Sequence, residues 1–394
     1  MGLPNISIAF KTAAAAAVQL SQKGVVGLII KDSKNNGPTT ITSATEIPEE
    51  LTEANKGYIA RTFYGYVNTP SKVILYVLPE ASENLSAALD YMATQTIDYL
   101  VGPPDTDTAE AEEIATWVKS QWELGAVPRA VIPKTEADHE AIVNFTAEEI
   151  TVGEQTYTAA QYCSRIAGLL AGTPLNISCT YAPLSEVTDI DRKTKDEMDA
   201  EIDEGKLILY HDGRKVKIGR GVNSLTTTTQ DKGEQFKKIK VVDTIATIKR
   251  DIQITAQDSY IGKYANSYDN KCLLITAIRG YFSQLEASGV LEAGRSTVGI
   301  DMDAQKTYLQ SIGTDTSSMT EQEIRSANTG YKVFWTHLSK FWMQSKTSPL
   351  ISLFKEARNV YGRKAGYQRH MGGSVAGLGA CCGVLWVAAQ GIHS

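Results

Sequence analysis

Alternating and amphipathic hydrophobic patterns divide the first half of the chain into strands and helices. The apolar runs that predict strands lie at 24–32, 72–78, 97–101, 130–132 and 142–145. Apolar residues recur at helical spacing over 82–94, 108–124 and 159–170, and further helical residues are expected after Thr135. Strands that alternate with helices are typical of a mainly parallel sheet. Residues 72–187 are therefore expected to form an α/β domain, preceded by a β-containing first region at 24–71.

The second half has a different pattern. Asp191–Glu204 predicts a charged helix, and the Asp-Gly turn between Leu207–Tyr210 and Val216–Ile218 predicts a β-hairpin. Helices are then expected over 244–264, 269–288 and 303–311. This succession indicates a separate α+β domain at 188–334. The fold class is therefore α+β with an α/β middle domain.

The first residues have the pattern of a strand that lacks a neighbour. Leu3–Phe10 reads LPNISIAF, in which Ile6, Ile8 and Phe10 share one face at period two. An alanine-rich stretch separates it from the next apolar run. Such a segment is either an edge strand of its own domain or an arm that adds a strand to a neighbour's sheet. Residues 1–23 are expected to form an N-terminal arm and linker.

Charge is unevenly distributed along the chain. The 394 residues carry 39 Lys+Arg and 45 Asp+Glu, a formal net charge of -6. Residues 331–394 hold 8 basic residues and a single acid, Glu356, so the first 330 residues have 31 basic and 44 acidic residues and a net charge of -13. An acidic chain disfavours a nucleic-acid partner. Direct membrane insertion is not expected either, because no apolar run reaches the roughly 20 residues that span a bilayer.

Candidate catalytic and metal-binding residues are sparse. The first 330 residues contain two histidines, His139 in a charged stretch and His211 in a turn, and both are expected to be solvated. Neither a G-x-S-x-G elbow nor a glycine-rich phosphate-binding turn is present. The five cysteines lack the paired spacing of a zinc or redox site. The sequence therefore predicts no catalytic site, no metal site and no cofactor.

The order of several stretches resembles the contractile-tail sheath proteins of bacteriophages. In chain order they are MGLPNISIAF, KGVVGLIIKD, YGYVNTPSKVILYVL, IDYLVGPP, SRIAGLLAGTPLNISCTYAPL, EIDEGKLILYHDGRKVKIGRGVNSLTT, KKIKVVDTIATIKRDI and SANTGYKVF. They cover residues 1 to about 334. The similarity is greatest to the small sheaths of PBSX-like defective prophages and related bacteriocins.

The resemblance implies a structural subunit rather than an enzyme. Sheath subunits of this family stack as hexameric rings around a tail tube, between baseplate and tail terminator proteins, and contract to drive the tube through a bacterial envelope. They assemble in the bacterial cytoplasm and then form part of a phage tail or phage-like particle. Their terminal arms add strands to the sheets of neighbouring subunits. The resemblance thus favours Leu3, Ile6, Ile8 and Phe10 as residues of a donated strand in a multidomain tail-sheath architecture.

Two other functions are compatible with the sequence. One is a soluble α/β enzyme, hydrolase-like, that uses a carboxylate pair in a concave acidic pocket. The other is the sheath subunit of a related contractile injection system.

Residues 335–394 depart from the family pattern, which ordinarily ends in an arm containing Leu-Asp-Ala. In the reading frame that joins the last base of each codon to the first two of the next, Phe341-Trp342-Met343-Gln344 yields Leu-Asp-Ala whichever synonymous codons are used. We therefore expect an atypical tail that arises from a frameshift, with Trp335, Phe341 and Trp342 exposed or opportunistically packed. The alternative is a genuine divergent extension.

Overall fold

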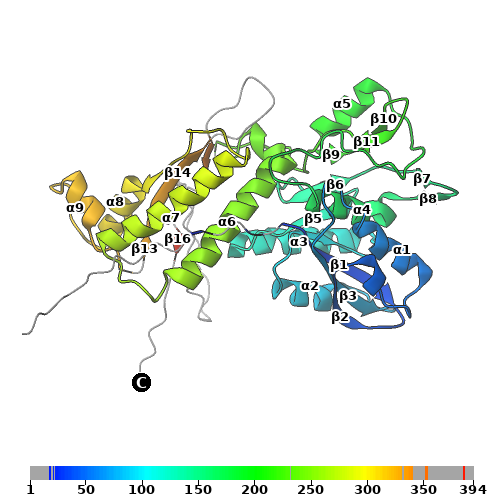
Figure 1. Ribbon diagram of the computed structural model, residues 1–394, viewed down its shortest axis with the longest axis horizontal. Helices are drawn as coiled ribbons and strands as arrows, with labels where there is room; N and C mark the ends of the chain where they lie inside the picture. The colour runs from blue at the N-terminus through cyan, green and yellow to red at the C-terminus, as the bar shows by residue number, and fades with distance from the viewer. Residues whose placement is uncertain are drawn as a thin grey trace, which may run out of the picture. The chain divides into compact units, whose positions relative to one another are not determined.

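The computed structural model describes residues 17–18, 21, 23–230, 232–330, 332–339, 351–353 and 385–386. The chain divides into two compact units, residues 21–250 and residues 1–20 with 251–394 (Figure 1). Among the described residues, no helix is both long enough and apolar enough to cross a membrane.

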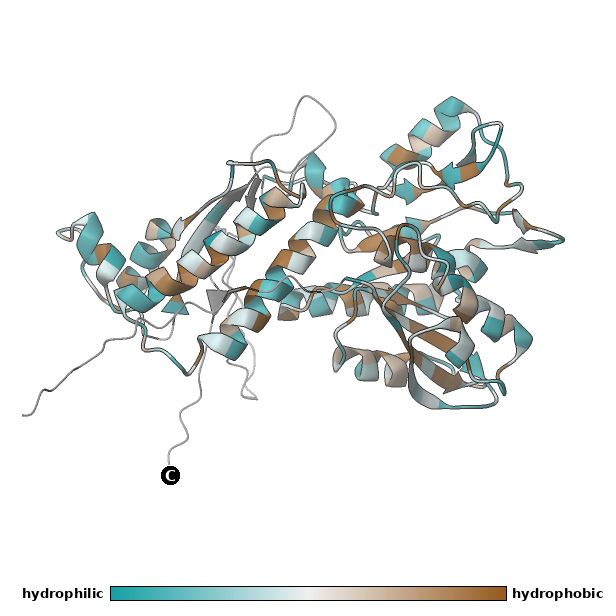
Figure 2. Ribbon diagram, in the orientation of Figure 1, coloured by the Kyte–Doolittle hydropathy of each residue, from teal (hydrophilic) through white to brown (hydrophobic). Residues whose placement is uncertain are grey.

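A seven-stranded sheet forms the centre of residues 21–250 (Figure 1). Its order is β2-β3-β1-β4-β5-β6-β9, and every neighbouring pair is parallel except β2 with β3. The strands are β1 (Val25–Asp32), β2 (Gly37–Ile41), β3 (Lys72–Pro79), β4 (Tyr99–Val101), β5 (Arg129–Pro133), β6 (Ile142–Phe145) and β9 (Lys206–Leu207). Figure 2 shows the central strands as hydrophobic along their length, as expected of a parallel sheet that is buried on both faces.

Helices cover both faces of this sheet. The helices α1 (Glu53–Thr62) and α4 (Ala159–Ala171) pack on one face, and α2 (Ser86–Ala93) and α3 (Thr108–Leu124) pack on the other. The helices predicted at 82–94, 108–124 and 159–170 are present, with ends within a few residues of those expected. The α/β fold class predicted for this region is confirmed.

The sheet also joins regions that the sequence pattern assigned to separate domains. The strand β1 pairs with β3 along its whole length, from Val25 opposite Lys72 to Asp32 opposite Pro79. At the other side, β9 pairs with β6. Residues 24–71, 72–187 and the start of 188–334 therefore share one unit, and the boundary lies at 250–251, inside α6 (Ile239–Ser259). These domain ranges differ from the predicted ones because strand pairing joins segments that are distant in sequence.

Smaller elements complete residues 21–250. The predicted hairpin is present as β10 (Leu209–His211) and β11 (Val216–Ile218), and a second hairpin is formed by β7 (Ile150–Val152) and β8 (Gln155–Tyr157). The charged helix α5 (Lys195–Asp203) begins at a capping box on Thr194 and has no buried residue, and Figure 2 shows it as mostly hydrophilic.

The prediction of helical residues after Thr135 is wrong. Residues 135–139 form a loop, flanked and interrupted by the positive φ angles of Lys134 (46°) and Asp138 (45°). A helix excludes such angles. The Asp138 carboxylate instead accepts hydrogen bonds from the backbone N–H groups of Thr226 and Thr227 at 2.7 and 2.9 Å, which fastens the loop to a distant segment.

Residues 251–394 contain the helices predicted at 269–288 and 303–311, a short helix that the sequence pattern did not predict, and a small antiparallel sheet. Beyond the end of α6, the helices are α7 (Tyr268–Ala287), α8 (Met302–Ser311) and α9 (Glu321–Ser326). The sheet has the order β12-β14-β15, formed by β12 (Thr297–Ile300), β14 (Trp335–Ser339) and β15 (Ile351–Leu353), and β13 (Lys332–Val333) pairs with β16 (Leu385–Trp386). In the same unit, buried Val18 and neighbouring Ala17 lie against α7 beside Thr276, Ala277, Gly280, Tyr281 and Gln284.

The start of the atypical tail is packed into this unit. Trp335 is 3% exposed and His337 is fully buried against Phe282, so Trp335 is buried rather than exposed. Phe341 and Trp342 lie outside the described residues. The frameshift concerns the encoding DNA rather than the fold; it stays a prediction, which sequencing of that DNA would decide.

Candidate functional site

The carboxyl ends of the parallel strands are the usual ligand-binding edge of an open α/β sheet. One buried acid there is Asp32, at the end of β1. Its carboxylate accepts hydrogen bonds from the N–H and hydroxyl of Thr52 at 3.0 Å and from the Asn55 amide at 2.8 Å. Burial alone would raise the pKa of Asp32, but these hydrogen bonds outweigh it and lower the pKa. Asp32 thus fixes the start of α1 to the sheet, which is a structural role.

A larger polar cluster lies at the opposite edge, where the amino ends of β1, β4 and β5 meet. It contains Ser21, Lys23, Asp98, Tyr99, Arg129, Asp243 and Arg250 and is termed the anchor network. Because the amino ends of parallel strands lie side by side, residues just before or at the start of each strand come together there. Two of the seven members, Asp243 and Arg250, come from α6.

Asp98 is the centre of one half of the anchor network. Its Oδ2 accepts hydrogen bonds from the backbone N–H groups of Gly24 and Val25 at 2.7 and 2.9 Å. Its Oδ1 accepts from Arg250 Nη1 at 2.7 Å and from Arg129 Nη2 at 3.4 Å. Burial raises the pKa of Asp98, but the two guanidinium groups and the two N–H groups overcome this effect and lower the pKa to about 2. Asp98 is therefore a buried carboxylate that stays charged.

Asp243 of α6 is the centre of the other half. Its Oδ1 accepts a hydrogen bond from the Tyr99 hydroxyl at 2.6 Å and lies 3.1 Å from Arg129 Nε. Its Oδ2 forms an ion pair with Lys23, whose ammonium group also donates to the Thr173 carbonyl at 3.2 Å. Burial and the charge of Asp243 raise the pKa of Tyr99 well above its usual value, so the hydroxyl remains a donor.

The anchor network ties two segments of the chain to the same sheet edge. Arg250 reaches Asp98 with one nitrogen and the Ser21 hydroxyl with the other, at 3.1 Å. Ser21, Lys23, Gly24 and Val25 are thereby held in place, and so is α6. Three cations surround two carboxylates in this buried site. Moving α6 or residues 23–25 away from the sheet edge would leave a buried charge without its partner, which is costly, so both segments are held in place.

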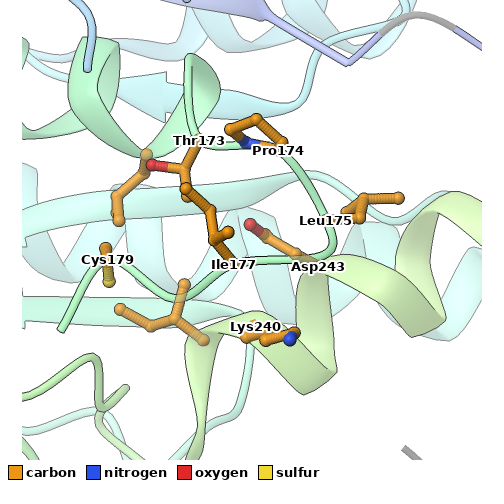
Figure 3. A pocket seen from close by; sticks show the side chains of 9 residues that line it. Thr173, Pro174, Leu175, Ile177, Cys179, Lys240 and Asp243 are labelled. Atoms are coloured by element: carbon orange, nitrogen blue, oxygen red, sulfur yellow. The ribbon is translucent and has the colours of Figure 1, made fainter. Parts of the chain in front are cut away.

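The space beside the anchor network does not fit a substrate. A cavity of about 10 Å³ lies next to Asp243 (Figure 3), which has room for about one water molecule. It is lined by Leu170, Thr173, Pro174, Leu175, Ile177, Cys179, Ile239, Lys240 and Asp243. In the part of the chain that the structure describes, no group of three or more His, Cys, Asp or Glu side chains is placed to hold a metal ion.

The two histidines considered from the sequence, His139 and His211, are not members of the anchor network. His139 is half-buried rather than solvated, and its ring meets Trp122 edge-on at 5.8 Å. Burial lowers its pKa. His211 ends β10, where its Nδ1 accepts a hydrogen bond from the Gly213 N–H at 3.0 Å. Leu3, Ile6, Ile8 and Phe10 of the predicted arm lie outside the described residues.

The anchor network was not found from the sequence, although a signal for it exists. Each contributing strand follows or begins with a charged residue: Lys23 precedes β1, Asp98 precedes β4 and Arg129 opens β5. A charge at the same relative position of successive buried parallel strands predicts a cluster at their amino edge. The contribution of α6 has no such signal, because it depends on where a helix more than 100 residues later in the sequence packs.

Comparisons with known proteins agree on one family. The family of the phage tail sheath protein central domain matches residues 81–224, and that of the phage tail sheath C-terminal domain matches residues 231–319. The tail sheath protein of Clostridium phage phiCD119 is 39% identical over 340 residues, which cover 85% of this chain and 94% of that protein. The phage-like element PBSX protein XkdK of Bacillus subtilis is 25% identical over 131 residues, 32% of this chain and 28% of that protein.

A solved structure has the same fold. The helical sheath of the anti-feeding prophage in its contracted state matches with a TM-score of 0.65 and 15% sequence identity, over 88% of this chain and 98% of that one. The predicted tail-sheath architecture is confirmed, and with the near-complete coverage of a phage tail sheath protein at 39% identity, this chain belongs to the phage tail sheath protein family.

Proposed function

We propose that this chain polymerises as stacked hexameric rings around a tail tube and contracts to drive the tube through a bacterial envelope. The observation that carries the proposal is the 39% identity to a phage tail sheath protein over 94% of its length. The similar fold of a contracted helical sheath supports it. Its partners would be further copies of itself, a tail tube protein, a baseplate and a tail terminator, with assembly in the bacterial cytoplasm before incorporation into a phage-like particle.

The same comparisons favour a sheath subunit over a soluble hydrolase. Two neighbouring carboxylates, Asp98 and Asp243, do occur in one buried site, but each is neutralised by guanidinium or ammonium groups. A carboxylate pair that exchanges protons during catalysis needs a pKa near the working pH. Asp98, with its pKa lowered to about 2, does not have one. The sheath subunit of a related contractile injection system has the same physical role as the proposed one.

The N-terminal arm would connect one subunit to the next by strand donation. Two features support this role for Leu3, Ile6, Ile8 and Phe10. The anchor network holds Ser21 and Lys23–Val25 on the sheet edge, so the arm would extend from a fixed point. A suitable acceptor also exists, because β12 is an edge strand of its sheet among the described residues. Main-chain hydrogen bonds to an added strand would then transmit force between subunits.

Substitutions on one face of the arm should abolish polymerisation. The paired change Ile6→Asp and Ile8→Asp places two charges on the face predicted to be buried, whereas Asn5→Asp and Ser7→Asp place them on the opposite face. We expect the first variant to remain unassembled at concentrations at least about tenfold above those at which the wild type assembles, and the second to stay near wild type. Sedimentation velocity measures the assembled fraction.

Both variants should keep the wild-type circular dichroism spectrum and melting temperature, since the arm precedes the first strand of the sheet. Equal assembly of the two variants would contradict strand donation. Deletion of residues 1–12 gives an independent test, and it should also leave a folded, unassembled protein.

A further inference from the structure

A groove on α7 lies beside Ala17 and Val18. Its volume is about 230 Å³, and its α7 side is formed by Thr276, Ala277, Gly280, Tyr281 and Gln284. A cavity of about 150 Å³ is enough to hold a benzene molecule, so this groove has room for several small side chains. In the part of the chain that the structure describes, no atom outside the α7 neighbours of Gly280 lies within 4 Å of a Cβ added there. The groove is therefore open above Gly280.

Val18 closes one side of the α7 groove. It is 1% exposed, whereas Ala17, the residue before it, is exposed at the groove wall. The opposite wall is fixed, because the hydroxyl of buried Tyr281 donates to Asp251 Oδ2 at 2.7 Å. The Thr276 hydroxyl donates to the Cys272 carbonyl within α7 at 2.8 Å. Neither hydroxyl needs a hydrogen bond from the segment that covers the groove.

The residues directly before Ala17 match the α7 groove in size and charge. Residues 13–16 are four alanines, and none of the residues that line the groove is charged. Because consecutive Cα atoms are about 3.8 Å apart, this alanine segment starts at the groove wall. Alanine loses no side-chain rotamer entropy when it is buried. A segment tethered beside its site also has a high effective concentration there.

We propose that Ala13–Ala16 occupy the α7 groove of their own chain. The same segment of a second copy would have to displace a tethered one, and a charged segment is disfavoured because the groove offers no opposite charge. The occupancy concerns a single chain and does not depend on the proposed function. One consequence does rest on that function: in strand donation only residues 1–12 could leave the subunit, with a reach of at most about 40 Å.

Maleimide labelling of an introduced cysteine tests whether the alanine segment covers the groove. Thr276→Cys and Gln284→Cys place a thiol at either end of it. In the unassembled full-length protein, at least one of these thiols should label at least about tenfold more slowly than in the same variant carrying Ala14→Asp and Ala15→Asp, because those charges would keep the segment out of the groove. Mass spectrometry identifies the labelled residue.

Ser283→Cys is the matched control for the labelling. Ser283 is exposed on α7, does not line the groove and, like Thr276, donates its hydroxyl to the carbonyl four residues earlier. Its labelling rate should be the same with and without the two aspartates. The proposal is overturned if both groove thiols also label at the same rate with and without them.

Disulfide formation identifies the chain that supplies the segment. Ala15→Cys should oxidise with Thr276→Cys or Gln284→Cys at least about tenfold faster than with Ser283→Cys. In a mixture of isotope-labelled and unlabelled chains, the disulfide should join residues of the same chain. Equal rates for all three pairs, or a disulfide between different chains, would overturn the proposal. Both tests use unassembled protein, so a failure to polymerise counts against the proposed function alone.

Discussion

Replacing Arg129 with methionine is expected to destabilise the protein by about 3 to 5 kcal/mol. Arg129 is 2% exposed and lies between Asp98 and Asp243, and its Nη1 also donates to the Val127 carbonyl at 3.2 Å. Methionine has a similar length but no charge, so two buried carboxylates would lose a shared cation. Urea unfolding followed by circular dichroism, below the concentration at which the protein assembles, measures the change.

Arg192→Met is the matched control for this substitution. Arg192 pairs with Asp189 at 3.0 Å, but its side chain is 63% exposed, and exposed pairs contribute at most about 1 kcal/mol. A loss of stability in Arg129→Met no larger than in Arg192→Met would contradict the role assigned to the anchor network.

The anchor network also predicts the acid dependence of stability. The pKa of Asp98 is about 2 in the folded protein and 3.8 as the reference value, so the unfolded state binds the proton more readily. The stabilisation from Asp98, roughly 2 to 3 kcal/mol, is present above about pH 4 and is lost as the pH falls toward 2. Asp98→Asn should accordingly show a shallower loss of stability over this range than the wild type.

A second large effect is expected from Gly168→Ala. Gly168 is on α4 and Gly172 is its C-cap, and the end of α1 and the loop after it approach closely at these two glycines. A Cβ on Gly168 would lie 1.9 Å from the Thr62 carbonyl oxygen, far inside van der Waals contact, so α1 and α4 would have to separate. We expect a loss of about 3 kcal/mol or more, although alanine is intrinsically the better helix former by about 1 kcal/mol.

Gly280→Ala gives the opposite expectation and serves as the control. Gly280 is in the middle of α7, and in the part of the chain that the structure describes no atom outside its own helix neighbours lies within 4 Å of an added Cβ. Here the helix propensity acts alone, so stability should be unchanged or rise by up to about 1 kcal/mol. Melting temperatures of the two variants should therefore move apart, and a similar shift in both would show that the close approach of α4 to α1 has been misjudged.

Elements defined by local chemistry could be predicted from the sequence. The helix α3 lies at Thr108–Leu124 as expected, because the Asp107 side chain caps its start and Gly125, with a φ of 95°, ends it. The hairpin around Asp212-Gly213 is another such element, since its turn residues fix the pairing of the two short strands. Neither element depends on distant parts of the chain.

Features that depend on strand order could not be predicted in the same way. The pairing of β1 with β3 unites residues that the pattern assigned to two domains, and no local signal specifies it. The anchor network likewise requires the pairing of β1 with β4 and of β4 with β5, together with the packing of α6. At residues 135–139 distant contacts overrode a local pattern. The sequence there predicted a helix, but hydrogen bonds from Thr226 and Thr227 to Asp138 hold the segment as a loop.

We propose that this member of the phage tail sheath protein family assembles into a contractile polymer. Negative-stain electron microscopy of the purified full-length protein tests it most directly. We expect rings or tubes with six-fold symmetry about their axis. A population of uniform small particles at every concentration, in a protein that melts cooperatively, would contradict it.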